Sequence, residues 1–141
     1  MNLEGIFSGL SVLAMLGWVA LALAPLQRTL CVAFARILAL LLAAAYLAQY
    51  FLTTETVDGA GFGSLAEVMA LFSAPGNVML GWTHYLAFDL FIGSWETEDA
   101  AKEGVPHWLL LPCLFLTFFL GPIGLLLYFA IKFGKRRFFP A

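Results

Sequence analysis

The sequence predicts an all-α integral membrane protein, a four-helix transmembrane bundle with a short interfacial or re-entrant helix between its second and third spans. Two observations predict this fold class. Hydrophobic residues make up 62% of the chain and charged residues only 11%, whereas an average soluble domain has about 25% charged residues. Most of the chain also falls into apolar runs of roughly 20 residues, the length that crosses a bilayer. The 141 residues therefore form one transmembrane domain, 1–141.

Four apolar runs define the expected spans. They cover approximately residues 3–24, 29–52, 78–95 and 105–133. Pro25 ends the first span, because the residue before a proline is disfavoured in the helical conformation. Residues 22–24 mimic a signal-peptidase site, but no positive charge precedes them and we expect a retained helix. The last span is long enough to tilt, or to bend at Gly121-Pro122.

The segment between the second and third spans contains a helix-start signal. Ser64 is followed three residues later by Glu67, which is the spacing of a capping box. The apolar residues that follow are too few to cross a bilayer, so residues 64–74 are expected to form a short interfacial or re-entrant helix. Such a helix either covers a lipid-accessible pocket at one end of the bundle or is a simple amphipathic connector.

The basic residues bear on orientation and partners. A C-terminal cationic cluster consists of Lys132, Lys135, Arg136 and Arg137. At a membrane edge, such a cluster is typical of a topology or lipid-headgroup signal, and we expect membrane lipid and no nucleic acid as a partner. The positive-inside rule favours a cytoplasmic N-terminus, with this cluster inside and Arg28 and Lys102 outside.

Ionisable residues occur deep in the third span, within the sequence GWTHYLAFDLFIGSW from Gly81 to Trp95. Its His84 and Asp89 stand out, because an aspartate at the centre of a membrane helix costs roughly 2.5 to 3.5 kcal/mol on insertion scales. Such residues usually face a bundle interior and take part in substrate, ion or proton chemistry. Asp89 is therefore the first candidate functional residue, the structural alternative being a buried pair with Arg36.

Helical spacing separates the polar residues of the third span into faces. Trp82, Tyr85, Asp89 and Glu96 share one stripe, and His84 and Phe88 share another. His84 and Asp89 lie about 140° apart around an ideal helix, so they can line one wide pocket but are poorly placed to bind the same ion. Tyr85 and Asp89 form an i,i+4 pair that can hydrogen-bond.

We expect no metal and no cofactor. Cys31 and Cys113 lack a metal-binding or redox spacing and are expected to be free thiols. Antiparallel third and fourth spans would also separate His84 from His107 by more than about 10 Å along the bundle, too far to share one metal ion. A metal site of Asp89, one histidine and the carboxylates Glu96, Glu98 or Asp99 remains an alternative.

The last span carries small or polar residues on one face. These residues are Cys113, Thr117, Gly121, Gly124 and Tyr128. Small residues let membrane helices approach closely, so this face should pack into the bundle. The inward sides of all four spans would then line an aromatic, apolar pocket with few polar groups, which is typical of a small-molecule site. Its candidate substrate-binding residues are Trp82, Phe88, Arg36, Thr117 and Tyr128.

Three stretches together resemble a known family. The run GWTHYLAFDLFIGSW, the Val105-Pro106-His107 that follows it, and LPCLFLTFFLGPIGLLLY from Leu111 to Tyr128 resemble the abscisic-acid-deficient-four (neoxanthin synthase-like) membrane proteins. The resemblance covers about residues 81–132, and the first two spans match mainly in hydropathy. The chain looks like a bacterial-type member without a plastid transit sequence, which implies a bacterial inner (cytoplasmic) membrane.

The resemblance implies carotenoid or xanthophyll chemistry. Neoxanthin formation isomerises a 5,6-epoxide to an allenic alcohol, which needs a proton donor at the epoxide oxygen, a base for the adjacent polyene carbon, and no cofactor. General acid and base groups typically contribute 10²- to 10⁴-fold each. The resemblance therefore implies Asp89 as the proton donor, His84 or His107 as the base, and Tyr85 as the residue that orients Asp89.

Two other functions stay open. A carotenoid- or lipid-binding protein without catalysis would use the same apolar pocket. A membrane assembly or transport subunit could place one buried acid in a homo-oligomer, although the chain lacks the internal repeat common in transporters. Oxidative carotenoid cleavage is disfavoured, because non-haem iron normally needs two histidines and a carboxylate together.

Overall fold

The computed structural model describes residues 2–138, which form six helices and no strand. The helices are α1 (Leu3–Ala22), α2 (Arg28–Leu52), α3 (Leu65–Leu71), α4 (Pro75–Lys102), α5 (His107–Leu120) and α6 (Pro122–Phe138). The side chain of Arg136, part of the predicted cationic cluster, lies outside this description.

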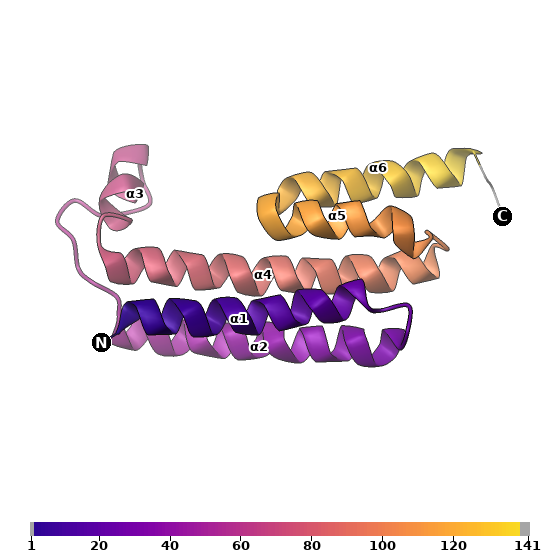
Figure 1. Cartoon of the computed structure of the whole chain (residues 1–141). Coiled ribbons are helices and arrows are strands. Elements are labelled where there is room, and N and C mark those ends of the chain that lie inside the picture. Colours follow the sequence, from indigo (N-terminus) through magenta and orange to yellow (C-terminus); the bar gives the residue numbers. More distant parts are fainter. Residues whose placement is uncertain (1, 139–141) are drawn as a thin grey trace.

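Three long helices, α1, α2 and α4, lie side by side, and the hairpin of α5 and α6 packs along the C-terminal half of α4 (Figure 1). The hairpin contacts α4 and α1, whereas α2 packs on α1 and α4 from the other side. The short helix α3 lies at the end of the bundle where α4 begins. The molecule is therefore a three-helix layer with a shorter helical hairpin on it.

The predicted last span is wrong as a single helix over 105–133, because the chain reverses at Gly121. This residue has φ +38° and separates α5 from α6. A positive φ is readily accessible only to glycine, and Pro122 suits the first position of the new helix because it has no N–H to satisfy. The bend expected at this dipeptide is a complete reversal.

The predicted four-span bundle is not confirmed. Two helices, α1 and α2, are long and apolar enough to cross a membrane. Helix α4 has 28 residues, longer than the predicted 78–95, because good helix formers continue it to Lys102. Helix α5 has 14 residues, or about 21 Å, which is short of the roughly 30 Å of a hydrocarbon core.

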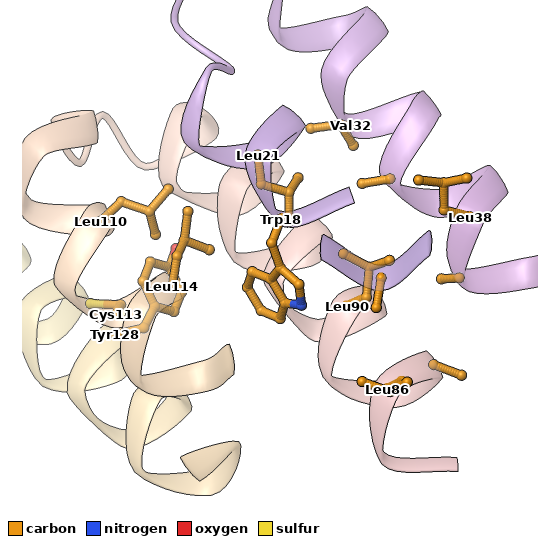
Figure 2. Packing of buried hydrophobic residues seen from close by; sticks show 14 of the residues in the cluster. Trp18, Leu21, Val32, Leu38, Leu86, Leu90, Leu110, Cys113, Leu114 and Tyr128 are labelled. Carbon is orange, nitrogen blue, oxygen red and sulfur yellow. The ribbon is translucent and has the colours of Figure 1, made fainter. Parts of the chain in front are cut away.

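The core lies where α1 crosses α4 (Figure 2). Trp18 packs on Gly93, where a Cβ would lie 2.6 Å from its ring, and Leu90 packs on Gly17 at the same distance. Glycines at both contacts let the helix backbones approach, as is usual for membrane helices. Both cysteines are free thiols, as predicted, with Cys113 buried in this core.

The predicted short helix and its cap are confirmed. The Ser64 hydroxyl accepts a hydrogen bond from the Glu67 amide at 3.2 Å. The Glu67 carboxylate accepts from the Gly63 amide at 2.8 Å, so it holds the residue before the cap. The helix lies beside the start of α4 at the bundle end, which agrees with an interfacial position.

Three chain segments meet at the opposite end of the bundle. The Nζ of Lys135 in α6 donates to the carbonyls of Glu103 and Gly104, at 2.7 and 2.6 Å. The Nε2 of His107 donates to the carbonyl of Ala22, the last residue of α1, at 3.0 Å. The C-terminal part of α6, the α4–α5 connection and the α1–α2 connection therefore share one end.

The predicted distribution of positive charge is wrong for this reason. The C-terminal cationic cluster was expected on the opposite membrane side from Arg28 and Lys102. It lies at the same end as both, because the chain reverses at Gly121 instead of crossing once more. The start of α1 and the end of α6 consequently lie at opposite ends of the bundle.

Candidate functional site

Asp89, in the middle of α4, faces the turn between α5 and α6, which we call the hairpin tip. A Cβ built on Gly121 would be 3.0 Å from its Oδ1 and 3.2 Å from its Oδ2. Asp89 is about 20 Å from either end of α4, counted at 1.5 Å per residue. The hairpin therefore covers only the C-terminal half of α4 and ends at the carboxylate in the middle of that helix.

One oxygen of this carboxylate has no protein partner. The Oδ2 atom of Asp89 is buried, and it forms no hydrogen bond with any residue in the described range. Buried polar atoms are nearly always hydrogen-bonded, so an exception calls for an explanation such as a ligand or a catalytic role. Asp89 thus combines central depth with unused hydrogen-bonding capacity.

Tyr85 joins α4 to the hairpin tip. Its hydroxyl donates to the carbonyl of Phe118, one of the last four carbonyls of α5, which have no partner within their own helix. The same hydroxyl lies close enough to Asp89 to interact with it. The stripe of Tyr85 and Asp89 predicted from helical spacing therefore faces the hairpin.

Aromatic side chains of α4 and α5 pack against α1 on both sides of Tyr85. Trp82 lies 5.4 Å from Phe7 of α1 and stacks on Tyr85 at 5.3 Å, measured between ring centroids. Phe118 of α5 meets Trp18 of α1 edge to face at 5.5 Å. The Tyr85 hydroxyl also bonds to the backbone carbonyl of Phe118, so the two ring groups lie on either side of this hydrogen bond.

An apolar cavity lies beside each of these two ring groups. A cavity of about 700 Å³ between α1 and α5 is lined in part by Trp18 and Phe118. A second, of about 380 Å³, lies between the starts of α1 and α4 and is lined in part by Phe7 and Trp82. We call the two cavities and the rings between them the α1 slot. Asp89 lines neither cavity; it lies beside Tyr85, between the two cavities along α4.

A second buried carboxylate faces the same hairpin. Glu96 is fully buried, and both its oxygens lie 3.1 Å from the hydroxyl of Thr117 in α5. Helix α6 passes closely here, since a Cβ on Gly124 would lie 2.1 Å from the Thr117 amide nitrogen. The sequence places Glu96 in the stripe of Asp89 and offers it as a ligand of the alternative metal site, but it is not among the predicted catalytic or substrate-binding residues, although an acid seven residues from Asp89 was the available signal.

The charged groups farther along α4 have partners. Tyr128 donates to Asp99 at 2.5 Å, and Lys132 pairs with Asp99 at 2.5 Å and with Glu103 at 3.3 Å. Tyr128 is completely buried. These contacts tie α6 to the C-terminal half of α4, so Tyr128, expected to bind substrate, holds the hairpin in place.

Arg36 pairs with a different carboxylate from the one considered in the sequence. Its guanidinium binds Glu98, and its Nε donates to Ser94 at 3.3 Å. The alternative pairing of Arg36 with Asp89 is therefore wrong, because Asp89 faces the hairpin while Arg36 approaches α4 from α2. Arg36 joins two helices and lies away from the α1 slot.

The structure does not bring the predicted acid and bases together. His84 is exposed on another face of α4, where it stacks on Phe88 at 4.6 Å and meets Tyr46 edge to face at 6.0 Å. His107 caps α1 at the bundle end, about 20 Å along α5 from the hairpin tip. Of the predicted catalytic residues, only Tyr85 and Asp89 are neighbours.

The alternative metal site is not assembled in the described part of the chain. No group of three or more histidine, cysteine, aspartate or glutamate residues within residues 2–138 lies close enough to hold a metal ion. Glu98 faces Arg36, and Glu96 faces Thr117. The carboxylates considered as ligands for a metal at Asp89 therefore point to other partners.

Comparison with known proteins assigns the family. A model of the family described as ABA DEFICIENT 4-like matches residues 5–128, which is most of the chain and nearly all of the helical structure. The chain belongs to this family. No curated protein and no solved structure matches it.

Membership of the ABA DEFICIENT 4-like family extends the resemblance found in the sequence. The match includes nearly all of α1, all of α2 and the motifs from residue 81 onwards, so most residues that line the α1 slot lie inside it. Membership links this protein to carotenoid-related function, and together with the two apolar helices it indicates a membrane protein.

Proposed function

We propose that this ABA DEFICIENT 4-like protein binds an epoxidised or hydroxylated carotenoid in the α1 slot and isomerises it by acid–base chemistry at Asp89. The position of Asp89 carries the proposal. Its carboxylate lies beside the aromatic rings between two apolar cavities, and its Oδ2 has no hydrogen-bond partner in the described structure. Long apolar sites with few, well-placed polar groups are typical of small-molecule binding.

The slot suits a long polyene with an oxygenated end ring. Trp82 and Tyr85 offer stacked ring faces on one side of Asp89, and Phe118 and Trp18 continue the apolar wall on the other. A ring placed at Asp89 would have its polyene in one of the two cavities, from which it could extend into lipid. Tyr85 would hold the carboxyl group in position from the other side.

One carboxyl group can carry out both proton transfers. Protonated Asp89 donates its proton to the epoxide oxygen, and the carbon–oxygen bond breaks to give the alcohol. The second carboxylate oxygen accepts the proton from the adjacent polyene carbon, whose electrons form the allene. Asp89 ends each cycle protonated, so the reaction consumes no cofactor. Because His84 and His107 lie elsewhere, this route replaces the histidine base expected from the sequence.

The proposal is tested by expression in hosts that accumulate β-carotene, zeaxanthin or violaxanthin, followed by chromatography of the pigments. Wild type should convert violaxanthin, the one of the three that carries a 5,6-epoxide, to an isomer of unchanged mass and leave β-carotene and zeaxanthin unchanged. Asp89→Asn should lower conversion by at least about 10²-fold, whereas Glu98→Gln, on the same helix but outside the slot, should convert like wild type. Full conversion by a correctly inserted Asp89→Asn variant would refute the acid–base role.

A non-catalytic carotenoid-binding role is the second candidate, favoured by the apolar character of both cavities. Purification from the same hosts would then give a coloured complex whose pigment is unchanged after incubation. In that case Asp89→Asn should keep the bound pigment, and bulky substitutions in the slot should remove it.

A further inference from the structure

A separate cavity lies on the other side of α4, between the end of α2, the α3 segment and the start of α4. Its volume is about 560 Å³. Tyr46, Tyr50, Phe72 and His84 supply aromatic walls. The residues lining it are not shared with either cavity of the α1 slot, so the proposed isomerisation does not use this space.

The polar side chains of this cavity are available to a ligand. Among described residues, His84 has only ring contacts, stacking on Phe88 and meeting Tyr46 edge to face. Tyr46 and Tyr50 likewise have aromatic contacts but form no hydrogen bond within residues 2–138. An imidazole and two phenols therefore face apolar surroundings with their hydrogen-bonding capacity unused.

The cavity wall is held in place without a ligand. Asn77 is buried, and its amide group forms three hydrogen bonds: it accepts from the Glu55 amide at 3.0 Å and donates to the carbonyls of Glu55 and Leu71, both at 2.9 Å. Phe72 packs on Gly81, where a Cβ would lie 2.7 Å from its ring. A site formed in advance loses little entropy on binding.

We propose that this cavity binds the oxygenated six-membered ring of an isoprenoid lipid, held by His84 and the two tyrosines. Ring faces on several sides select a flat or cyclic group, and the imidazole and phenols can donate hydrogen bonds to a ring carbonyl or hydroxyl. The prenyl tail lies in the surrounding lipid. Two molecules share this chemistry, a membrane quinone and the hydroxylated end ring of a xanthophyll.

The test uses the full chain in phosphatidylcholine nanodiscs, with the amounts of a short-chain benzoquinone and of zeaxanthin retained above those in empty nanodiscs measured in separate titrations. His84→Phe keeps the ring and removes its nitrogens, and should weaken binding about five- to tenfold, the loss of roughly one hydrogen bond. Leu80→Trp should fill the cavity and abolish binding. Leu40→Trp, on an exposed part of α2, is the matched control and should bind like wild type.

Ala22→Phe, which fills the α1–α5 cavity of the α1 slot, should leave this binding unchanged, which separates the site from the proposed isomerase. A response to the quinone alone identifies a quinone site, and a response to zeaxanthin alone identifies a xanthophyll-ring site. The proposal is overturned if neither molecule binds, or if both bind equally well to wild type, His84→Phe and Leu80→Trp.

Discussion

Gly121 lies against the carboxylate of Asp89, so that a Cβ on this glycine would be 3.0 Å from Oδ1. One residue thus supplies both the reversal between α5 and α6, at φ +38°, and the close approach of the hairpin tip to the middle of α4. The surroundings of the Asp89 carboxylate therefore depend on the backbone conformation of Gly121, which is distant in the sequence.

Gly121→Ala should destabilise the protein by more than about 1 kcal/mol, because a side chain at this positive φ is strained and also contacts Asp89. A lowered melting temperature in nanodiscs would show it. Gly9→Ala is the control: its Cβ would meet nothing within 4 Å, and alanine is the better helix former. Equal stability of the Gly121→Ala variant would mean that the hairpin does not turn there as described.

Thr117→Val should destabilise the hairpin by about 1 to 3 kcal/mol, because it removes the hydroxyl that bonds to the fully buried Glu96 and leaves a polar group without a partner. Thr117→Ser keeps the hydroxyl and should stay closer to wild type. If the double change Thr117→Val with Glu96→Leu regains stability in chemical denaturation, the loss came from the unpaired carboxyl group; no regain would assign it to packing.

Lys132→Met should cost more than about 1 kcal/mol, since it removes the lysine that pairs with the carboxylates of Asp99 and Glu103 in a largely buried site. Lys102→Met removes an exposed partner of Glu98 and should cost at most about 1 kcal/mol. Thermal unfolding of the two variants gives the comparison. Similar losses for both would contradict the structural role assigned to Lys132.

We predict that α5 and α6 do not cross the membrane a further time, so the α5–α6 hairpin determines on which side the C-terminal part of α6 lies. With α5 and α6 entering and leaving at one face, the C-terminal part of α6 lies on the same side as the α1–α2 connection, and the positive-inside rule makes that side cytoplasmic. In a chain whose native cysteines are replaced, Gln27→Cys and a C-terminal tag should therefore be reached from the cytoplasm. Asp58→Cys should be labelled from outside; labelling of Asp58→Cys and the tag from one side would restore a four-span arrangement.

Local sequence features determined the helices of the first half well. Pro25 and the capping pair Ser64 and Glu67 mark boundaries that depend on nearby residues, and the predicted spans there agree closely with α1, α2 and α3. The stripe shared by Tyr85, Asp89 and Glu96 was also correct, because helical periodicity fixes which side chains lie on one face.

The sequence by itself determined an all-helical, apolar chain with an acid in the middle of α4. Only the tertiary structure decided that α5 and α6 fold back, that Arg36 pairs with Glu98, and that His84 and His107 lie away from Asp89. The physical reason is that hydropathy gives the length of an apolar helix, and periodicity gives which side chains share one of its faces, but both describe a single helix. Whether Gly121 bends or reverses the chain, and which side chain meets which, depends on packing between helices distant in sequence.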